Sequence, residues 1–190
     1  SLYVHVPFCP QLCYFCGCNT QRGNDRSFIV RYFDALEREI DIIAEQIDRS
    51  RPVTQVHWGG GTPNSVDWSL VERVMERFRD HFTFTNDTEI AMECSPAYLD
   101  LQDVDRILSM GFNRISLGIQ DFNEAVLRII HRKPSLRPVE ELVESIRNNS
   151  RAGVNLDFIY GLPGQSVESY LETMEKAVSI APDRLVTFSY

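Results

Sequence analysis

Four of the five cysteines of this 190-residue chain lie within ten residues of one another. Cys9, Cys13 and Cys16 are spaced by three and then two intervening residues, and Cys18 follows at once. Thiols this close cannot connect distant segments, so their spacing favours a metal site in a reducing compartment over a disulfide framework. Three thiolates can hold three irons of a [4Fe–4S] cluster and leave the fourth iron open to a second molecule. We therefore predict Cys9, Cys13 and Cys16 as cluster ligands.

A zinc site is the main alternative for these cysteines. Structural zinc is usually held by two Cys or His pairs that close a tetrahedron. No second pair is present, because the fifth cysteine is the distant Cys94 and the four histidines are scattered. Cys18 could be a fourth ligand, but it follows Cys16 by only two residues, which strains a shared site. Buried thiols without a metal are a further alternative.

A run of glycines offers a place for the second molecule. Residues 59–63 read Gly-Gly-Gly-Thr-Pro and end a strand-like segment. Glycine adopts positive φ without steric cost and lets the backbone approach a ligand closely. The run lacks the Gly-Lys-Ser/Thr ending of a phosphate-binding loop. Gly60, Gly61 and Thr62 are therefore candidate contacts for another ligand, with an ordinary tight turn as the alternative.

Three polar residues each lie near the end of a different strand-like segment. They are Glu93, Gln120 and Asp157. A buried carboxylate is costly unless it is paired or bound to a ligand, so a structural ion pair or a helix cap is the alternative for each acid. Arg132 lies on a loop after the strand-like segment that ends at Gln120. For this residue, a solvent-exposed charge is the simpler interpretation.

Strand-like and helix-like segments alternate along the chain and must position these residues. Helical periodicity is seen over residues 25–47, 70–82, 104–110, 123–130, 138–149 and 167–181. Strand-like patterns cover residues 2–6, 55–58, 89–93, 114–120, 154–159 and 184–190. Such alternation predicts a parallel sheet with right-handed crossovers.

The two faces of the predicted strands differ in polarity. In residues 114–120, Ile115 and Leu117 share one face, while Ser116 and Gly118 share the other. Parallel strands covered by helices on both faces usually form continuous apolar runs. The pattern therefore predicts a partial (β/α)6 TIM-like barrel, with parallel strands, helices outside and a partly polar interior that holds a ligand. An open doubly wound sheet is the alternative.

Length and composition limit the classes of function. We expect one domain over residues 1–190. The net charge of −8 argues against a nucleic-acid-binding surface, and no apolar run is long enough to span a membrane. Together with the cysteine usage, this predicts a cytoplasmic protein, and we expect a monomer. The chain begins inside a strand-like segment, so we expect it to be a fragment.

The Cys-x3-Cys-x-Phe-Cys spacing, with Phe15 as the aromatic residue, resembles the radical S-adenosylmethionine (SAM) superfamily. The resemblance implies that the open iron binds the amino and carboxylate groups of SAM. Reductive cleavage then releases a 5′-deoxyadenosyl radical, so the cofactor performs the difficult chemical step. The glycine run resembles the superfamily's glycine motif, which contacts the methionyl amino group of SAM.

Several motifs together resemble a narrower family, the oxygen-independent coproporphyrinogen III oxidases (dehydrogenases). They are residues 3–5 (Tyr-Val-His), 16–18 (Cys-Gly-Cys), 57–63, 118–122 (Gly-Ile-Gln-Asp-Phe) and 157–163. The resemblance implies a radical SAM barrel that binds two SAM molecules. By motif position, the first SAM would be contacted by Tyr3, Gly60, Glu93 and Arg132. The second would be contacted by Phe15, Gly61, Thr62, Gln120 and Asp157, and Cys18 would not be a cluster ligand.

This family converts two propionates of coproporphyrinogen III to vinyl groups and gives protoporphyrinogen IX. The resemblance implies a tetrapyrrole substrate and a small redox protein as electron donor. Arg22, Arg114 and Arg128 are cations that could pair with the substrate's carboxylates. The resemblance also implies an N-terminal extension and further C-terminal structure, which we expect to lie outside this sequence.

Two sister functions on the same scaffold are alternatives. One is an anaerobic haem-degrading radical SAM methyltransferase. The other is a haem chaperone relative, against which Cys18 counts, since that branch typically lacks this cysteine. A non-catalytic iron–sulfur or zinc protein is the alternative from a different class, but it leaves the glycine run, Glu93, Gln120 and Asp157 unexplained.

Overall fold

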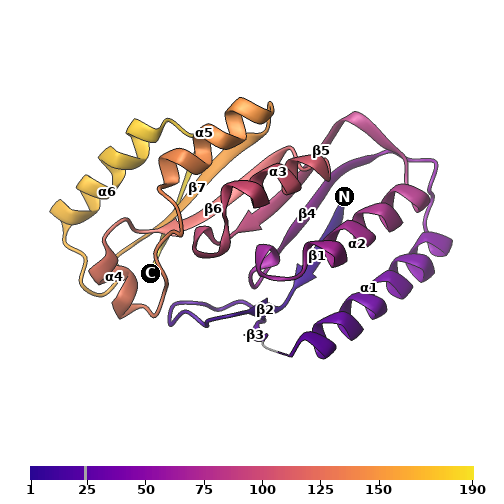
Figure 1. The fold of residues 1–190 in the computed structure, drawn as a ribbon, viewed down its shortest axis with the longest axis horizontal. Helices are drawn as coiled ribbons and strands as arrows, with labels where there is room; N and C mark the ends of the chain where they lie inside the picture. Colours follow the sequence, from indigo (N-terminus) through magenta and orange to yellow (C-terminus); the bar gives the residue numbers. More distant parts are fainter. Residues whose placement is uncertain (24) are drawn as a thin grey trace.

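The computed structural model describes residues 1–23 and 25–190. Its main sheet has six strands in the order β1-β4-β5-β6-β7-β8, and every neighbouring pair is parallel (Figure 1). The strands are β1 (Leu2–Val6), β4 (Val53–Gly60), β5 (Phe84–Cys94), β6 (Arg114–Gln120), β7 (Gly153–Tyr160) and β8 (Arg184–Ser189). All their carboxyl ends therefore lie along one edge.

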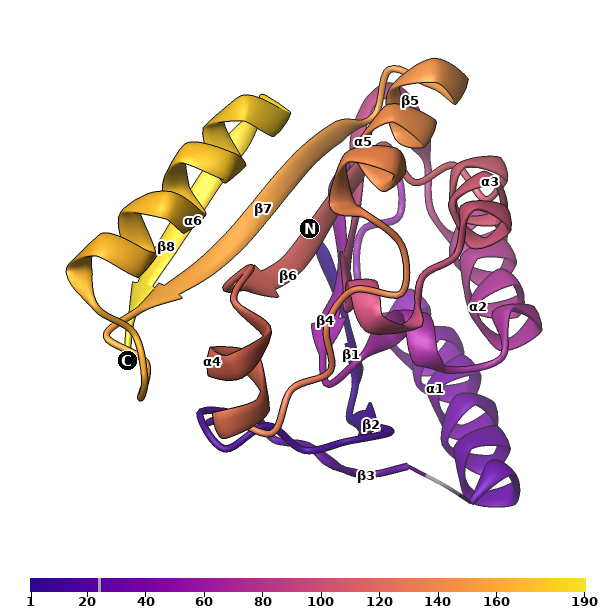
Figure 2. The ribbon, with the colours of Figure 1, turned by 60° about the vertical axis from the view of Figure 1, so that its left-hand side comes forward.

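Helices connect successive strands and lie on one side of the sheet (Figures 1 and 2). They are α1 (Arg26–Gln46), α2 (Trp68–His81), α3 (Leu101–Ser109), α5 (Val139–Asn149) and α6 (Val167–Ile180). The short α4 (Glu124–Ile129) follows the end of β6, and 3-10 turns cover Pro63–Ser65 and Pro96–Tyr98.

The strand order decides between the two predicted architectures. A doubly wound sheet reverses its order at a switch point, and its helices cover both faces. Here the spatial order follows the chain order without reversal, as in a (β/α) barrel. β1 and β8 are not paired with each other in the described part of the chain, so the sheet is a partial barrel. The predicted six-stranded parallel sheet with outer helices is confirmed.

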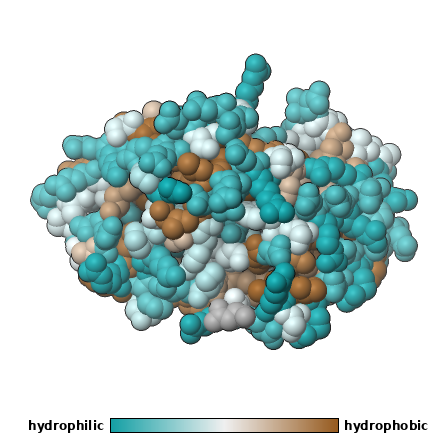
Figure 3. All heavy atoms as spheres, in the orientation of Figure 1, coloured by the Kyte–Doolittle hydropathy of each residue, from teal (hydrophilic) through white to brown (hydrophobic). Residues whose placement is uncertain are grey.

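The predicted alternation of faces places the core between sheet and helices. Val4, Val6, Trp58 and Leu117 point toward the helices and are fully buried. Amphipathic helices cover them because their apolar side chains recur with the helical period. Figure 3 shows the helix-covered side of the molecule as largely hydrophilic, with apolar side chains gathered in separate patches. The other strand face, which carries the polar residues, is left for a site.

Several predicted boundaries were wrong by a few residues. β4 begins at Val53 and β5 at Phe84, because these two residues pair with each other across an irregularity in the ladder. α3 begins at Leu101, where Asp100 and Asp103 form a reciprocal capping box. The last strand ends one residue earlier than predicted, at Ser189. The bounds of β1 and β6 are as predicted.

Two short strands were not predicted. β2 (Phe8–Cys9) and β3 (Gln21–Arg22) form a small parallel sheet at the base of the cysteine loop. The Gly23 amide donates to the Cys9 carbonyl at 3.0 Å. Strands of two residues are too short to show a period in the sequence. Their effect is to close the cysteine loop at its base.

The helices of the described residues include none that is both long and apolar enough to cross a membrane.

Candidate functional site

A cleft of about 470 Å³ opens at the carboxyl ends of the strands. Eight of the predicted site residues line it: Phe15, Cys16, Gly60, Gly61, Glu93, Gln120, Arg132 and Asp157. They come from the cysteine loop, from the ends of β4, β5, β6 and β7, and from the turn after α4. The volume lies within the range of about 300–1,000 Å³ that is typical of small-molecule sites.

The cysteine loop is held at its tip as well as at its base. The Tyr14 amide donates to the Ile130 carbonyl at 3.0 Å, and the Gln11 amide group donates to the His131 carbonyl at 2.7 Å. His131 in turn donates from Nδ1 to the Leu12 carbonyl at 2.7 Å. Figures 1 and 2 both show the loop beside α4. These contacts fix the position of the thiols relative to β6.

Fixed donors point at two of the three thiols. The Thr62 hydroxyl donates to Cys9 Sγ at 3.4 Å, and Arg132 Nη1 donates to Cys13 Sγ at 3.5 Å. Burial raises the pKa of Cys9, and the bond from Thr62 opposes that rise. Cys16 is exposed, and all five cysteines are free of disulfides. Such donors stabilise thiolate ligands and tune the metal centre that they hold.

The three thiols on the cysteine loop are the ligand type of an iron–sulfur cluster. Over residues 1–23 and 25–190, no group of three His, Cys, Asp or Glu side chains is placed to hold a single metal ion. A [4Fe–4S] cluster binds each thiolate at a different iron, so its ligands stand farther apart than those of one ion. Three thiols on one loop, two of them with fixed donors, are ligands of the type that such a cluster takes.

The glycine run packs directly against the chain that leads into the cysteine loop. The Gly61 amide donates to the Val6 carbonyl at 2.7 Å, and the Thr62 amide donates to the Phe8 carbonyl at 2.9 Å. A Cβ at Gly61 would lie 2.7 Å from the Phe8 carbonyl oxygen. Gly60 has φ +107°, which favours glycine. The glycines therefore have a structural role, since they let β4 end beside the thiols.

Glu93 has a partner that the sequence did not reveal. His57 Nε2 lies 2.9 Å from its Oε1, and this contact raises the pKa of His57. The Tyr3 ring stacks on His57 with centroids 5.9 Å apart, and the Tyr3 hydroxyl contacts His5 Nδ1 at 3.0 Å. Tyr3 is thus one layer behind the cleft, outside its lining. The sequence could have indicated His57, because it lies on the same face of β4 as Gly59, the first residue of the glycine run.

Gln120 is aimed into the cleft by a backbone irregularity. The pairing of β6 with β7 shifts register between Gly118 and Gln120. Gln120 also has φ +69°, an uncommon conformation for a residue with a side chain. Such bulges often redirect side chains next to active sites. A Cβ at Gly118 would lie 3.0 Å from Arg132 Nη2 and from Gln120 Nε2, so this glycine makes room for both.

Arg132 connects the cysteine loop to β6. Besides its bond to Cys13, its Nη2 donates to the Gly118 carbonyl, and its guanidinium lies over the Phe15 ring at 5.9 Å. Phe15 itself packs against a small apolar cluster that includes Leu127 and Ile159. Arg132 is therefore a partly buried cation at the floor of the cleft, rather than a solvated surface charge.

Asp157 lines the cleft, and no described residue donates a hydrogen bond to its carboxylate. It is half-buried, and burial together with the charge of Glu93 raises its pKa to about 6, although Arg132 acts in the opposite direction. No hydrogen bond from another described residue contributes to that pKa. A carboxylate in this position is destabilising unless a ligand donates to it. Asp157 is thus available to accept hydrogen bonds from a molecule in the cleft.

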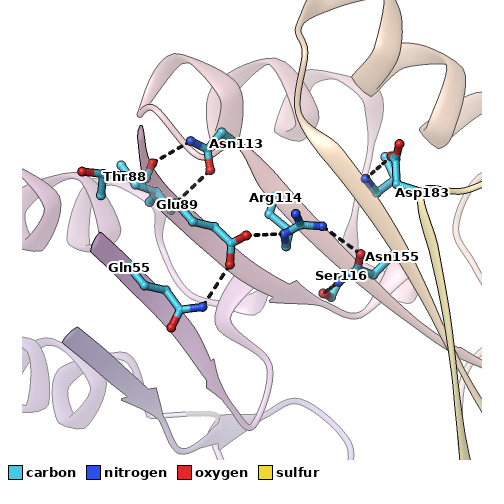
Figure 4. A network of polar contacts seen from close by, with 10 residues as sticks. Gln55, Thr88, Glu89, Asn113, Arg114, Ser116, Asn155 and Asp183 are labelled. Atoms are coloured by element: carbon cyan, nitrogen blue, oxygen red, sulfur yellow. Dashed lines mark hydrogen bonds and ion pairs between the residues drawn. The ribbon is translucent and has the colours of Figure 1, made fainter. Parts of the chain in front are cut away.

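Arg114 lies at the opposite end of the strands. Its Nε donates to Glu89 at 2.7 Å and its Nη1 donates to Asn155 at 3.2 Å, within the polar network of Figure 4. Glu89 also accepts a bond from Gln55 at 3.0 Å. Arg114 is already paired there, so the idea that it meets substrate carboxylates in the cleft was wrong. Arg22 lines a different hollow, described below.

The Radical SAM superfamily matches this chain over residues 3–177. The oxygen-independent coproporphyrinogen III oxidase of Escherichia coli is 41% identical over 194 residues, which cover all of this chain and 41% of the relative. The protein of that name from Synechocystis is 38% identical, with the same coverage. The chain therefore spans about two fifths of the length of the curated relatives that it matches.

Solved structures agree with the sequence relatives. The coproporphyrinogen III oxidase HemN from Escherichia coli aligns with a TM-score of 0.94 and 41% identity, over 100% of this chain and 44% of that one. A radical SAM methyltransferase, TsrM from Kitasatospora setae, aligns with a TM-score of 0.65 and 15% identity, over 95% and 32% of the two chains. The second likeness concerns the fold alone.

Proposed function

Because the chain belongs to the radical SAM superfamily, we propose that it forms the catalytic barrel of an oxygen-independent coproporphyrinogen III oxidase. Membership implies a [4Fe–4S] cluster and SAM as the cofactors. The observation that supports the narrower assignment is one cleft that brings together the cysteine loop, the glycine run and the four polar residues from separate elements. The 41% identity to named oxidases supports it as well.

Cys9, Cys13 and Cys16 would hold the cluster. The three thiols lie on a loop that is fixed at both ends, and Thr62 and Arg132 donate to two of their sulfurs. Donors to a thiolate reduce its negative charge and favour the reduced cluster, since hydrogen bonds to the sulfurs help to set the potential. Cys18, which lines the cleft, would not be a ligand.

Two SAM molecules would bind around this centre. Tyr3, Gly60, Glu93 and Arg132 would contact the first, and Phe15, Gly61, Thr62, Gln120 and Asp157 would contact the second. Glu93, held by His57, presents a carboxylate to the cationic amino group of a methionyl moiety. Asp157 can accept bonds from hydroxyl groups, as its lack of a partner suggests. Tyr3 would act through His57, on which its ring stacks, since Tyr3 lies outside the lining.

The proposed reaction converts two propionates of coproporphyrinogen III to vinyl groups. Each propionate loses one hydrogen atom, one CO2 and one electron, and the electron passes to an acceptor. When bound, the cluster and SAM together supply the carbon radical that removes the hydrogen atom. The chain's own residues orient the cofactor and keep water from the buried wall of the cleft, where Phe15 and Ile159 lie.

The remaining partners follow from this assignment. A small redox protein would donate the electron that starts each cycle. We further propose that the barrel is a single domain over residues 1–190, and that the protein acts as a monomer in the cytoplasm.

An anaerobic assay of the full-length protein tests the proposal. The reconstituted protein, SAM, a reductant and coproporphyrinogen III should give protoporphyrinogen IX with two carboxylates lost, measured by mass spectrometry after oxidation to the porphyrins. A Glu93→Gln variant should keep its iron and lose most of the turnover. Consumption of haem, with coproporphyrinogen III untouched, would reassign the protein to the haem-degrading methyltransferases.

A further inference from the structure

The cysteine loop borders two separate hollows. Cys16 lines the cleft described above, whereas Cys13 lines a second hollow of about 470 Å³ on the other side of the loop. The second hollow is also lined by Pro10, Gln11, Leu12, Tyr14, Arg22 and His131. No predicted SAM contact lies in it. We call these seven residues the outer face of the loop.

The outer face is partly apolar, and its aromatic ring is held by a stacking contact. Tyr14 is 73% exposed and its ring stacks on His131, with centroids 5.0 Å apart and planes 15° from parallel. Leu12 is 41% exposed, although its carbonyl is bound by His131. Exposed apolar side chains that are held in place and rimmed by polar groups are typical of protein-binding sites. Aromatic residues in particular contribute much of the binding energy of interfaces.

The outer face itself carries a cation, Arg22, and none of its seven residues is acidic. The two segments that meet there, residues 1–23 and 125–138, contain four Arg and one Lys and no Asp or Glu, in a chain of net charge −8. Arg137 is paired with Asp100 and Arg132 lies inside the site. Arg22, on the outer face, and Arg128, on α4 three residues before His131, are both exposed, and neither takes part in an ion pair among the described residues.

We propose that the outer face is the docking site of a small acidic one-electron carrier protein. The inference rests on the proposed function, in which the cluster held by Cys9, Cys13 and Cys16 must be reduced. Cys13 gives this face contact with a cluster ligand, while SAM and substrate occupy the cleft on the other side. One electron leaves the carrier, which is oxidised by one unit, and enters the cluster; no bond is made or broken. Arg22 and Arg128 attract the carrier, and Leu12 and Tyr14 form the apolar centre of the contact.

The charge complementarity favours an acidic protein as the occupant. A positive patch on an otherwise negative molecule steers an acidic partner to one orientation and raises its association rate. An uncharged apolar partner would gain nothing from Arg22 and Arg128. The steering is screened by salt, since the Debye length is about 8 Å at physiological ionic strength.

Stopped-flow kinetics test the proposal without turnover. The reconstituted full-length protein is mixed under anaerobic conditions with a photochemically reduced acidic [2Fe–2S] ferredoxin, and the rate of ferredoxin oxidation is followed at several salt concentrations. Arg22→Glu/Arg128→Glu should lower the second-order rate constant about tenfold or more at low salt and abolish its decrease with added salt. Reduction by dithionite, iron content and the effect of SAM on the electron paramagnetic resonance spectrum should not change.

A matched double variant serves as control. Arg38→Glu/Arg151→Glu makes the same change of charge at two exposed arginines outside the outer face, and should retain the wild-type rate. Leu12→Glu should slow the ferredoxin reaction while the dithionite reaction is kept. Equal ferredoxin rates for Arg22→Glu/Arg128→Glu and wild type, or equal losses in both double variants, would overturn the docking site alone. A wild-type protein that neither reductant can reduce would contradict the proposed function, and the docking site with it.

Discussion

Replacing Asp157 with asparagine should stabilise the protein and weaken cofactor binding. Burial and the charge of Glu93 raise the pKa of Asp157 from 3.8 to about 6. At about 1.36 kcal/mol per unit, this shift corresponds to about 3 kcal/mol against the ionised form. The carboxyl group is only partly buried, so solvent screening reduces the expected effect to about 1–2 kcal/mol.

The effect of Asp157→Asn should depend on pH in a defined direction. The pKa of Asp157 is higher in the folded state than in the unfolded state, so ionisation opposes folding. This destabilisation is small at pH 4 and complete above about pH 7. The variant should therefore match wild type at pH 4 and be about 1–2 kcal/mol more stable at pH 8. For a chain of this length, that gain corresponds to about 2–8 °C in Tm.

Urea denaturation of the cofactor-free protein at pH 4, 6 and 8 measures this difference. Asp87→Asn, at an exposed position on β5, controls for the loss of one negative charge. A stabilisation that is the same at every pH, or a destabilised Asp157→Asn variant at pH 8, would refute the reasoning. Titration calorimetry on the reconstituted protein should show weaker SAM binding to the variant, because asparagine offers one carbonyl oxygen in place of a charged carboxylate.

Three further predictions concern the supports of the site. Gly61→Ala should lower the free energy of unfolding by about 1–3 kcal/mol in thermal denaturation, because the new Cβ would overlap two backbone carbonyls. The control Gly17→Ala, whose Cβ would meet no atom within 4 Å, should change it by no more than about 0.5 kcal/mol. Equal losses of stability in the two variants would contradict the packing argument. His57→Gln should lower the stability of the protein below about pH 6.5, where the protonated His57 is stabilised by Glu93. Above the raised pKa of His57, the stability should be unchanged. A loss of stability confined to high pH would contradict this pH dependence. After reconstitution, most of the roughly four irons per chain should be lost in each of three variants, Cys9→Ser, Cys13→Ser and Cys16→Ser, whereas Cys18→Ser should retain them. Iron analysis measures this difference, and loss of iron in Cys18→Ser would contradict the predicted ligand set.

Strand parity allowed much of the cleft to be predicted from the sequence. Ile115 and Leu117 were expected on the face opposite Ser116 and Gly118, and the structure buries the first pair completely. Glu93 and Asp157 were predicted near the ends of their strand-like segments. Both line the cleft. Short-range periodicity therefore carries over directly into the geometry of a parallel sheet.

Features that depend on long-range contacts could not be predicted in this way. The bulge that aims Gln120 arises from its pairing with β7, and no local pattern marks it. The tether of Arg132 to Cys13 joins residues 119 positions apart. The unpredicted β2 and β3 pair residues 13 positions apart, such as Phe8 and Gln21. Each of these contacts needs the fold before it can form.

The reduced cluster's response to SAM tests the central claim most directly. Anaerobically reconstituted and reduced protein is examined by electron paramagnetic resonance with and without SAM, and with Glu93→Gln and Asp157→Asn as variants. The account predicts a cluster signal that SAM alters in wild type, with the variants requiring higher SAM concentrations. A wild-type spectrum that SAM leaves unchanged would contradict the claim that three cysteines leave one iron open in this cleft.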